Sequence, residues 1–135
     1  MKKILIIDDD EEVCKLTKMI LDKTGRYEAV FSTHAKEGIE LARTLNPGLV
    51  LLDVLMPEMD GAEVATRLSE IESLKKVPIV FITAVAIPMV FLAALVENEE
   101  LKQRVGQVGG HYFIQKPVTP NELVTRIEEV LNEPR

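Results

Sequence analysis

Two hydrophobic patterns alternate along this chain. Short runs dominated by β-branched, aromatic and other apolar residues occur at residues 3–7, 27–31, 49–53, 77–82 and 112–114. Continuous apolar runs of this length are typical of strands that are buried on both faces of a parallel sheet. We therefore predict five strands. The third run ends in a carboxylate, Asp53, and the chain then turns through Met56-Pro57 and Asp60-Gly61.

Between these runs, apolar residues recur at helical spacing. This spacing predicts helices at residues 11–23, 35–45 and 62–71, and a last helix that Thr119-Pro120-Asn121-Glu122 opens as a capping box. The apolar residues of the four helices are Val13, Leu16, Met19 and Ile20; Ile39, Ala42 and Leu45; Val64, Leu68 and Ile71; and Leu123, Ile127, Val130 and Leu131. Strands that alternate with helices predict an α/β fold, a doubly wound parallel sheet of flavodoxin-like type with strand order 2-1-3-4-5.

Composition narrows the function. A chain of 135 residues has room for one domain, residues 1–135. The net charge of −6 and a pI near 5.0 argue against direct nucleic-acid binding. The single Cys14 cannot form an internal disulfide and is expected to be a small residue on a partly buried helix face. The start of the chain has no signal-peptide pattern, so we expect a cytoplasmic location.

The predicted strand order brings three carboxylates together. Strands 1 and 3 are neighbours in that order, so Asp8, Asp9 and Asp53 should meet at the carboxyl edge of the sheet. Close carboxylates repel one another and normally hold a cation or raise a pKa. Oxygen ligands favour a hard ion such as Mg²⁺. Taken alone, the acidic run from Asp8 to Glu12 would be explained by helix capping, which accounts for Asp10 but not for Asp53.

Two further polar residues belong to the same edge. Thr83 follows the fourth strand and Lys116 follows the fifth. A hydroxyl and an ammonium group beside a carboxylate–metal site can bind the oxygens of a phosphoryl group. Each residue alone would be read as an ordinary strand or surface residue. Their joint placement at successive strand ends indicates a phosphoryl site.

Four motifs carry a family resemblance: I-L-I-I-D-D-D at residues 4–10, D-V-L-M-P-E-M-D-G at 53–61, F-I-T-A at 81–84 and F-I-Q-K-P at 113–117. With them, the chain resembles the receiver domain of two-component response regulators, the CheY-like family. The resemblance implies that Asp53 is the phosphorylation site and takes its phosphoryl group from a sensor histidine kinase or a phosphotransfer protein. It also implies Mg²⁺, with Mn²⁺ as a substitute, bound by Asp9, Asp53 and the backbone carbonyl of Leu55, with Asp8 acting through water.

The same resemblance assigns the remaining roles. Lys116 would pair with a phosphate oxygen, Thr83 would move to hydrogen-bond the phosphoryl group, and Phe113 would occupy the aromatic switch position without the hydroxyl of the commoner tyrosine. The structural turns would be formed by Pro57, Gly61 and Pro117, the last in a cis peptide bond. Phosphorylation would then shift a two-state equilibrium on the face made by the fourth helix, the fifth strand and the last helix, and a downstream protein target would bind through that face. Such a domain is no enzyme beyond assisting its own phosphorylation and dephosphorylation.

One segment departs from the family. Thr83 and Lys116 are 33 positions apart, which is longer than the spacing expected from the family. The extra length falls at about residues 85–109. Residues 84–96 within this stretch carry no charge. Pro88 within this run argues against a membrane span. A longer fourth helix, partly buried, would explain the segment, as would an exposed apolar helix that forms a homodimer or binds a partner.

Two other functions fit parts of the sequence. A haloacid-dehalogenase-like phosphatase also uses an aspartate nucleophile and Mg²⁺, and Asp8-x-Asp10 superficially fits its motif. That reading leaves residues 56–61 unexplained. A receiver fold that serves only as an interaction scaffold, without phosphorylation, is opposed by the complete set of acids, threonine and lysine.

Overall fold

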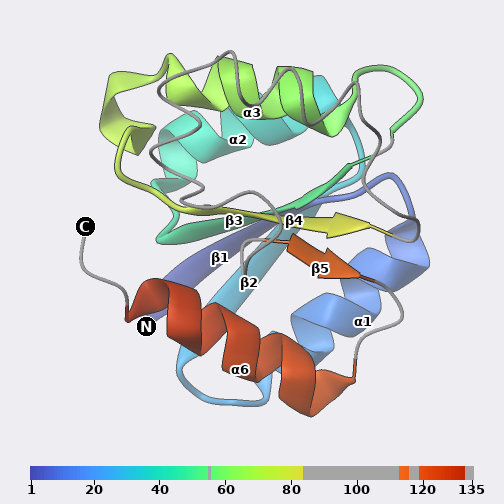
Figure 1. Ribbon diagram of the computed structural model, residues 1–135, viewed down its shortest axis with the longest axis vertical. Helices are drawn as coiled ribbons and strands as arrows, with labels where there is room; N and C mark the ends of the chain where they lie inside the picture. The colour runs from blue at the N-terminus through green and yellow to red at the C-terminus, as the bar shows by residue number, and fades with distance from the viewer. Residues whose placement is uncertain (55, 84–112, 116–118, 133–135) are drawn as a thin grey trace.

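A computed structural model describes residues 1–54, 56–83, 113–115 and 119–132. Its five strands form one parallel sheet in the order β2-β1-β3-β4-β5, which confirms the predicted topology (Figure 1). The strands are β1 (Lys2–Ile7), β2 (Tyr27–Ser32), β3 (Leu49–Asp53), β4 (Ile79–Thr83) and β5 (Phe113–Gln115). The fourth strand begins two residues later than predicted, because Pro78 has no N–H to donate to a sheet ladder.

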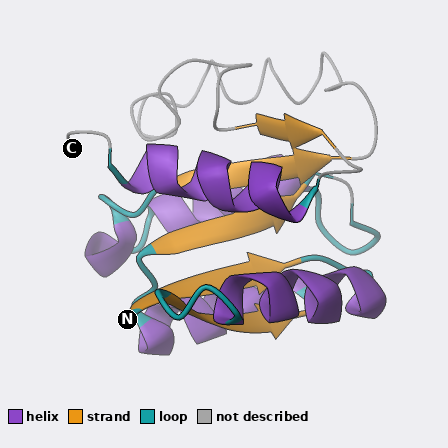
Figure 2. Ribbon diagram, turned by 90° about the horizontal axis from the view of Figure 1, so that it is seen from below, coloured by secondary structure: helices purple, strands orange, loops and turns teal. Residues whose placement is uncertain are grey.

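Helices cover both faces of this sheet. Figure 1 shows α2 (Ala35–Leu45) and α3 (Gly61–Ser69) on one face, and α1 (Glu11–Asp22) and α6 (Pro120–Leu131) on the other. Figure 2 views the molecule from below, with α1 and α6 lying side by side in front of the sheet. A short 3₁₀ turn, η1 (Glu72–Leu74), follows α3 and was not predicted. The fold is therefore the doubly wound three-layer arrangement expected from the sequence.

The core lies between the sheet and its helices. Ile4, Leu5, Ile7 and all of Leu49 to Leu52 are at most 1% exposed, as expected for strands covered on both faces. Helix α2 approaches β1 closely because it carries a glycine there. A β-carbon on Gly38 would lie 2.8 Å from Cδ1 of Ile7. Close helix–sheet packing therefore depends on the absence of a side chain at Gly38.

The buried face of α1 differs from the apolar residues that predicted this helix. Cys14, Thr17 and Leu21 are buried, whereas Leu16 and Met19 are 56% and 51% exposed. The three buried residues are spaced three and four positions apart and form a single narrow stripe against the sheet. The spacing of apolar residues predicts that this segment is a helix. It does not predict which stripe of the helix faces the sheet, because that depends on the elements packed against it. The other predicted helix faces are buried or partly buried.

The terminal helix begins as its sequence predicts. Thr119 is the N-cap, and its Oγ1 accepts a hydrogen bond of 3.1 Å from the backbone N–H of Glu122. Residues 84–112 lie outside the described residues, and with them lie the predicted fourth helix and the proposed dimer segment 85–109. Within the described part of the chain, no helix is long and apolar enough to cross a membrane.

Candidate functional site

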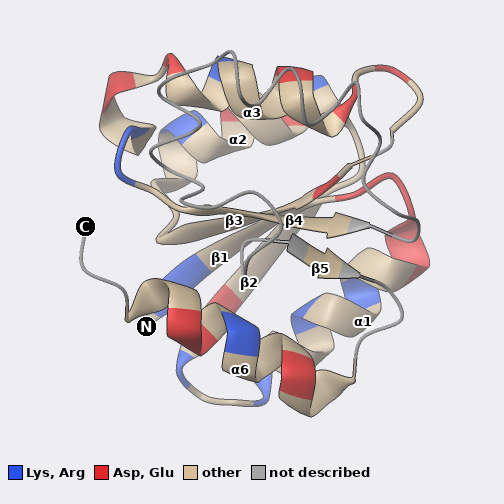
Figure 3. Cartoon of the chain, in the orientation of Figure 1, with Lys and Arg blue, Asp and Glu red and all other residues tan. Residues whose placement is uncertain are grey.

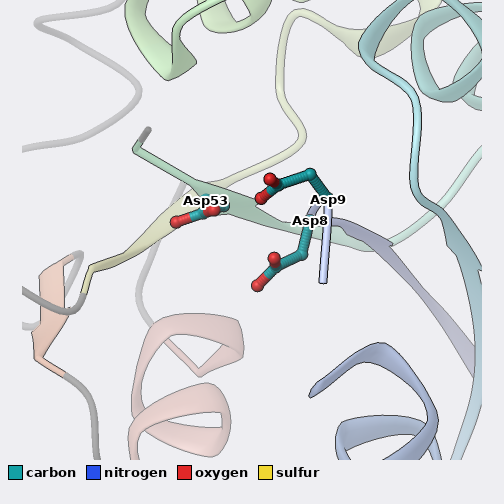
Figure 4. Close-up of side chains that lie close together, drawn as sticks. All are labelled: Asp8, Asp9 and Asp53. Carbon is teal, nitrogen blue, oxygen red and sulfur yellow. The ribbon is translucent and has the colours of Figure 1, made fainter. Parts of the chain in front are cut away.

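Three carboxylates meet where β1 and β3 end. The two strands are parallel neighbours with Ile7 opposite Leu52, so Asp8 and Asp53 come next in register at the carboxyl edge. One carboxylate oxygen from each of Asp8, Asp9 and Asp53 lies within 4.8 Å of the others. Figure 4 shows the three side chains projecting into one space beyond the strand ends. The predicted acid cluster therefore exists in the fold.

The cluster is partly shielded from water. Asp8 is 1% exposed and Asp53 is 8% exposed, whereas Asp9 is exposed. Figure 3 shows acidic residues at the loops that follow the ends of β1 and β3. Like charges at this separation repel one another by about 1 kcal/mol per pair in bulk water, and by more where both are buried, as Asp8 and Asp53 are. A bound cation would relieve that repulsion.

Backbone contacts hold Asp8 at the end of β1. Its N–H donates to the carbonyl of Ser32 at 3.2 Å, and its Oδ1 accepts from the N–H of Asp10 at 3.0 Å. Its carbonyl accepts from the Cys14 thiol, with 3.3 Å between Sγ and the oxygen. Cys14 is fully buried and is a packing residue of α1, as expected from the sequence.

Asp10 has the capping role that its position predicts. Its side chain accepts a hydrogen bond from the N–H of Val13 at 3.3 Å and caps α1. Among the described residues, the acid cluster contains Asp9 and not Asp10. Of these two adjacent aspartates, Asp9 joins the acid cluster, whereas Asp10 is the N-cap of the helix that begins at Glu11.

The loop after Asp53 is closed by Gly61 and Asp60. The N–H of Gly61 donates to the carbonyl of Val54 at 2.8 Å, and the side chain of Asp60 caps α3 through the N–H of Glu63 at 2.9 Å. Met56 and Met59 are buried within this loop, while Pro57 is exposed. Asp53 is therefore followed at once by a compact, internally bonded turn.

The ends of β4 and β5 lie on the same side of the sheet. Asp53 pairs in register with Ile82, which places Thr83 one residue beyond it, and Thr83 pairs with Gln115. Phe113 begins β5 opposite Phe81. The structure therefore brings the backbones of Thr83 and β5 to the predicted edge. Leu55, Lys116 and Pro117 lie outside the described residues.

Sequence reasoning missed Glu58. Its Oε1 accepts a hydrogen bond of 2.7 Å from the N–H of Ala35, the first residue of α2. The N-cap residue of that helix, His34, makes no side-chain capping bond. A weak capping residue before a well-formed helix is a signal that an acceptor comes from elsewhere in the chain.

The donor set suits a hard divalent ion. All three side chains offer carboxylate oxygens, and the cluster has no nitrogen or sulfur ligand among the described residues. Mg²⁺ binds through one or two carboxylates and keeps several waters, which an open cluster with one exposed member allows. Asp8, Asp9 and Asp53 are therefore able to hold such an ion.

Comparison with known proteins agrees with this geometry. The profile of the response regulator receiver domain matches residues 4–128. Transcriptional regulatory protein SrrA of Staphylococcus aureus is 35% identical over 130 residues, which cover 96% of this chain and 47% of that protein. The chain thus spans about half the length of the curated relatives it matches.

Solved structures show the same fold. A CheY-like receiver domain protein from Methanospirillum hungatei superposes with a TM-score of 0.81 at 26% identity, covering 98% of this chain and 94% of that one. Chemotaxis protein CheY4 of Vibrio cholerae gives a TM-score of 0.77 at 25% identity, covering 96% and 98%. The chain belongs to the response regulator receiver domain family of two-component signalling.

Proposed function

We propose that Asp53 is the residue that accepts the phosphoryl group. A carboxylate oxygen of Asp53 attacks the phosphorus of a phosphohistidine and forms an O–P bond while the N–P bond breaks. The electron pair of the broken bond stays on the imidazole nitrogen, which then takes up a proton from solvent. The product is an acyl phosphate on Asp53. The observation that carries this proposal is the meeting of Asp53 with Asp8 and Asp9 at the carboxyl edge of adjacent strands.

Asp8, Asp9 and Asp53 would hold Mg²⁺, with Mn²⁺ as a substitute. When bound, the ion supplies positive charge that offsets the repulsion between the carboxylates and an incoming phosphoryl group. The chain's own contribution is to keep the acids in place. Asp8 is held by Ser32 and Asp10, and Asp53 stands at the end of a fully buried strand. We assign a further ligand, the backbone carbonyl of Leu55, from the family resemblance alone.

Lys116 and Thr83 would bind the phosphoryl oxygens. The parallel register of β3, β4 and β5 supports this assignment, because it brings Thr83 and the residue before Lys116 opposite one another next to Asp53. We further assign the aromatic switch to Phe113 at the start of β5. The phosphorylated form would then bind its downstream protein target through the face that contains β5 and α6, in the cytoplasm.

The test is phosphorylation by a small donor. The protein is incubated with acetyl phosphate or phosphoramidate in MgCl₂, and intact mass is measured. We expect a gain of one phosphoryl group that is absent in EDTA and absent from Asp53→Asn. An unchanged mass with every donor and with a histidine kinase would overturn the proposal and favour the scaffold function.

The phosphatase reading has a specific observation against it. The motif of that class would require Asp8 and Asp10 to serve the active site together. Asp10 instead caps α1, and Asp9 joins the cluster. Self-association through residues 85–109 stays a hypothesis. Light scattering that shows a monomer at high protein concentration, with and without a phosphate mimic, would exclude it.

A further inference from the structure

A side chain of the β3–α3 loop, Glu58, reaches the start of α2. Oε1 of Glu58 lies 2.7 Å from the backbone nitrogen of Ala35, 23 positions earlier in the sequence. Ala35 is fully buried, so its N–H has no access to bulk water. A buried N–H without an acceptor costs about 1–3 kcal/mol. Glu58 therefore satisfies a donor that α2 itself leaves open.

No residue of α2 replaces this acceptor. His34 is the N-cap and makes no side-chain capping bond. Ser32 donates its Oγ hydrogen to the carbonyl of His34 at 3.0 Å, and that Oγ accepts from the N–H of His34 at 3.2 Å. Glu37 of the first turn lies 3.4 Å from the same hydroxyl. The local polar groups are thus engaged with one another, and the N–H of Ala35 is left for Glu58.

This contact completes a path of hydrogen bonds around the acid cluster. On one side, the N–H of Asp8 donates to the carbonyl of Ser32, which leads directly into α2. On the other side, Gly61 closes the loop onto Val54, the residue after Asp53. The bond from Ala35 to Glu58 joins these two halves. It connects the segment that follows β2, the strand that pairs with β1, to the loop that follows Asp53.

We propose that Glu58 is a positioning residue for the acid cluster. By capping α2, it holds the β3–α3 loop at a set distance from the end of β1, and so keeps Asp53 near Asp8 and Asp9 against their mutual repulsion. The role rests on the proposed function of this cluster as the metal-dependent phosphoacceptor. Within the described residues, Glu58 bonds to the N–H of Ala35 and to none of the three acids, so it acts through the backbone.

The experiment compares two variants of Glu58. Glu58→Gln keeps an acceptor oxygen for the N–H of Ala35 and removes the charge, whereas Glu58→Ala removes both. Mg²⁺ affinity is measured by the shift of thermal unfolding with MgCl₂ concentration, and the N–H of Ala35 is followed by hydrogen exchange. Glu70→Ala, at the C-terminal end of α3, is the control for loss of an exposed acid.

We expect Glu58→Ala to weaken Mg²⁺ binding about tenfold, the lower end of what supporting residues of metal ligands cost. Ala35 should lose its exchange protection in the same variant. Glu58→Gln should retain both properties within about twofold, because screening weakens the effect of one exposed charge. Glu70→Ala should match the unmodified protein.

Three results would overturn the proposal. Suppose that Glu58→Ala binds Mg²⁺ with normal affinity although Ala35 loses its exchange protection. Glu58 would then cap α2 without positioning the acid cluster. Equal losses in Glu58→Gln and Glu58→Ala would assign the effect to charge. If the N–H of Ala35 exchanges freely in the unmodified protein, its hydrogen bond to Glu58 does not form. That last readout needs neither metal nor phosphate, so it separates this proposal from failure of Asp53 to be phosphorylated.

Discussion

Gly61 and Asp53 meet backbone to backbone. A β-carbon placed on Gly61 would lie 2.7 Å from the carbonyl oxygen of Asp53 and 3.0 Å from Cα of Val54. Side-chain atoms do not fill this space, so no rotamer change can relieve the contact. Helix α3 therefore begins against the end of β3, and the geometry of Asp53 depends on having no side chain at Gly61.

This contact predicts the effect of Gly61→Ala. Within a helix, alanine is favoured over glycine by about 1 kcal/mol, so intrinsic propensity alone would stabilise the variant. We expect the opposite, a loss of about 1–3 kcal/mol in the free energy of unfolding, because the backbone must shift to admit the methyl group. Urea denaturation measures this, and the phosphorylation yield with acetyl phosphate should fall in parallel.

Gly48→Ala is the matched control. Its β-carbon would meet only the flexible side chain of Lys2, 3.3 Å from Cδ, with the nearest backbone atom 3.7 Å away. We expect a change smaller than about 0.5 kcal/mol, typical of surface substitutions. A Gly61→Ala protein as stable and as readily phosphorylated as this control would contradict the steric argument.

The change in stability caused by Asp8→Asn should have opposite signs without and with Mg²⁺. The amide oxygen can still accept from the N–H of Asp10, but one of three crowded charges is removed. In EDTA we expect the free energy of unfolding to rise by about 1 kcal/mol. In MgCl₂ the unmodified protein should be the more stable one, since binding stabilises the folded state by mass action.

Thermal unfolding in EDTA and in MgCl₂ measures this reversal. Asp10→Asn provides the control, because asparagine caps helices as well as aspartate and Asp10 is not in the cluster. That variant should gain the same stability from Mg²⁺ as the unmodified protein. A destabilised Asp8→Asn in EDTA would show that repulsion in the cluster is not significant.

Ionisation of Asp22 should contribute to the pH dependence of the free energy of unfolding. The hydrogen bond from Lys18 lowers the pKa of Asp22 below 3.8, helped by the N–H of Ala29 and opposed by burial. A lowered folded-state pKa contributes stability above the unfolded value near 3.8, and this is lost as pH falls through the folded pKa. Asp22→Asn should therefore be less stable at pH 7 by up to about 1 kcal/mol, the range of exposed pairs.

Urea denaturation at pH 7 and at pH 3 tests this prediction. The difference between Asp22→Asn and the unmodified protein should shrink at the lower pH. Glu11→Gln is the control, because the pair of Glu11 with Lys15 is 4.0 Å long and exposed on both sides. A deficit in Asp22→Asn that is equally large at both pH values would rule out the ionised carboxylate as its source.

Gly38→Ala should also destabilise the protein, although alanine is favoured over glycine within a helix. The added methyl would lie 2.8 Å from Cδ1 and 2.9 Å from Cγ1 of Ile7, which is fully buried. We expect a loss of about 1–3 kcal/mol from overpacking. Ile7→Val removes Cδ1, so the double variant should recover part of that loss. Additive losses in a double-mutant cycle would show that the two residues do not interact.

The hydrophobic pattern of the sequence determined the architecture. Continuous apolar runs such as Leu49–Leu52 are typical of strands in a sheet covered on both faces, and helical segments between them favour a parallel sheet. From strand order alone, Asp8, Asp9 and Asp53 could be placed at one edge. Thr119 could be assigned as a helix cap for the same kind of reason, because its partner lies three residues away.

Tertiary structure decided what depends on distant partners. The burial of Thr17 in place of Leu16, and the bond between Glu58 and Ala35, follow from how elements pack and leave little trace in local spacing. The sequence placed Asp53 at the end of a strand that a turn follows at once. In the fold, Asp60 caps α3, and Asp53 is brought together with Asp8 and Asp9. Periodicity encodes which face of an element is apolar, whereas only packing decides that the side chain of Glu58 meets the backbone N–H of Ala35 across 23 residues of chain.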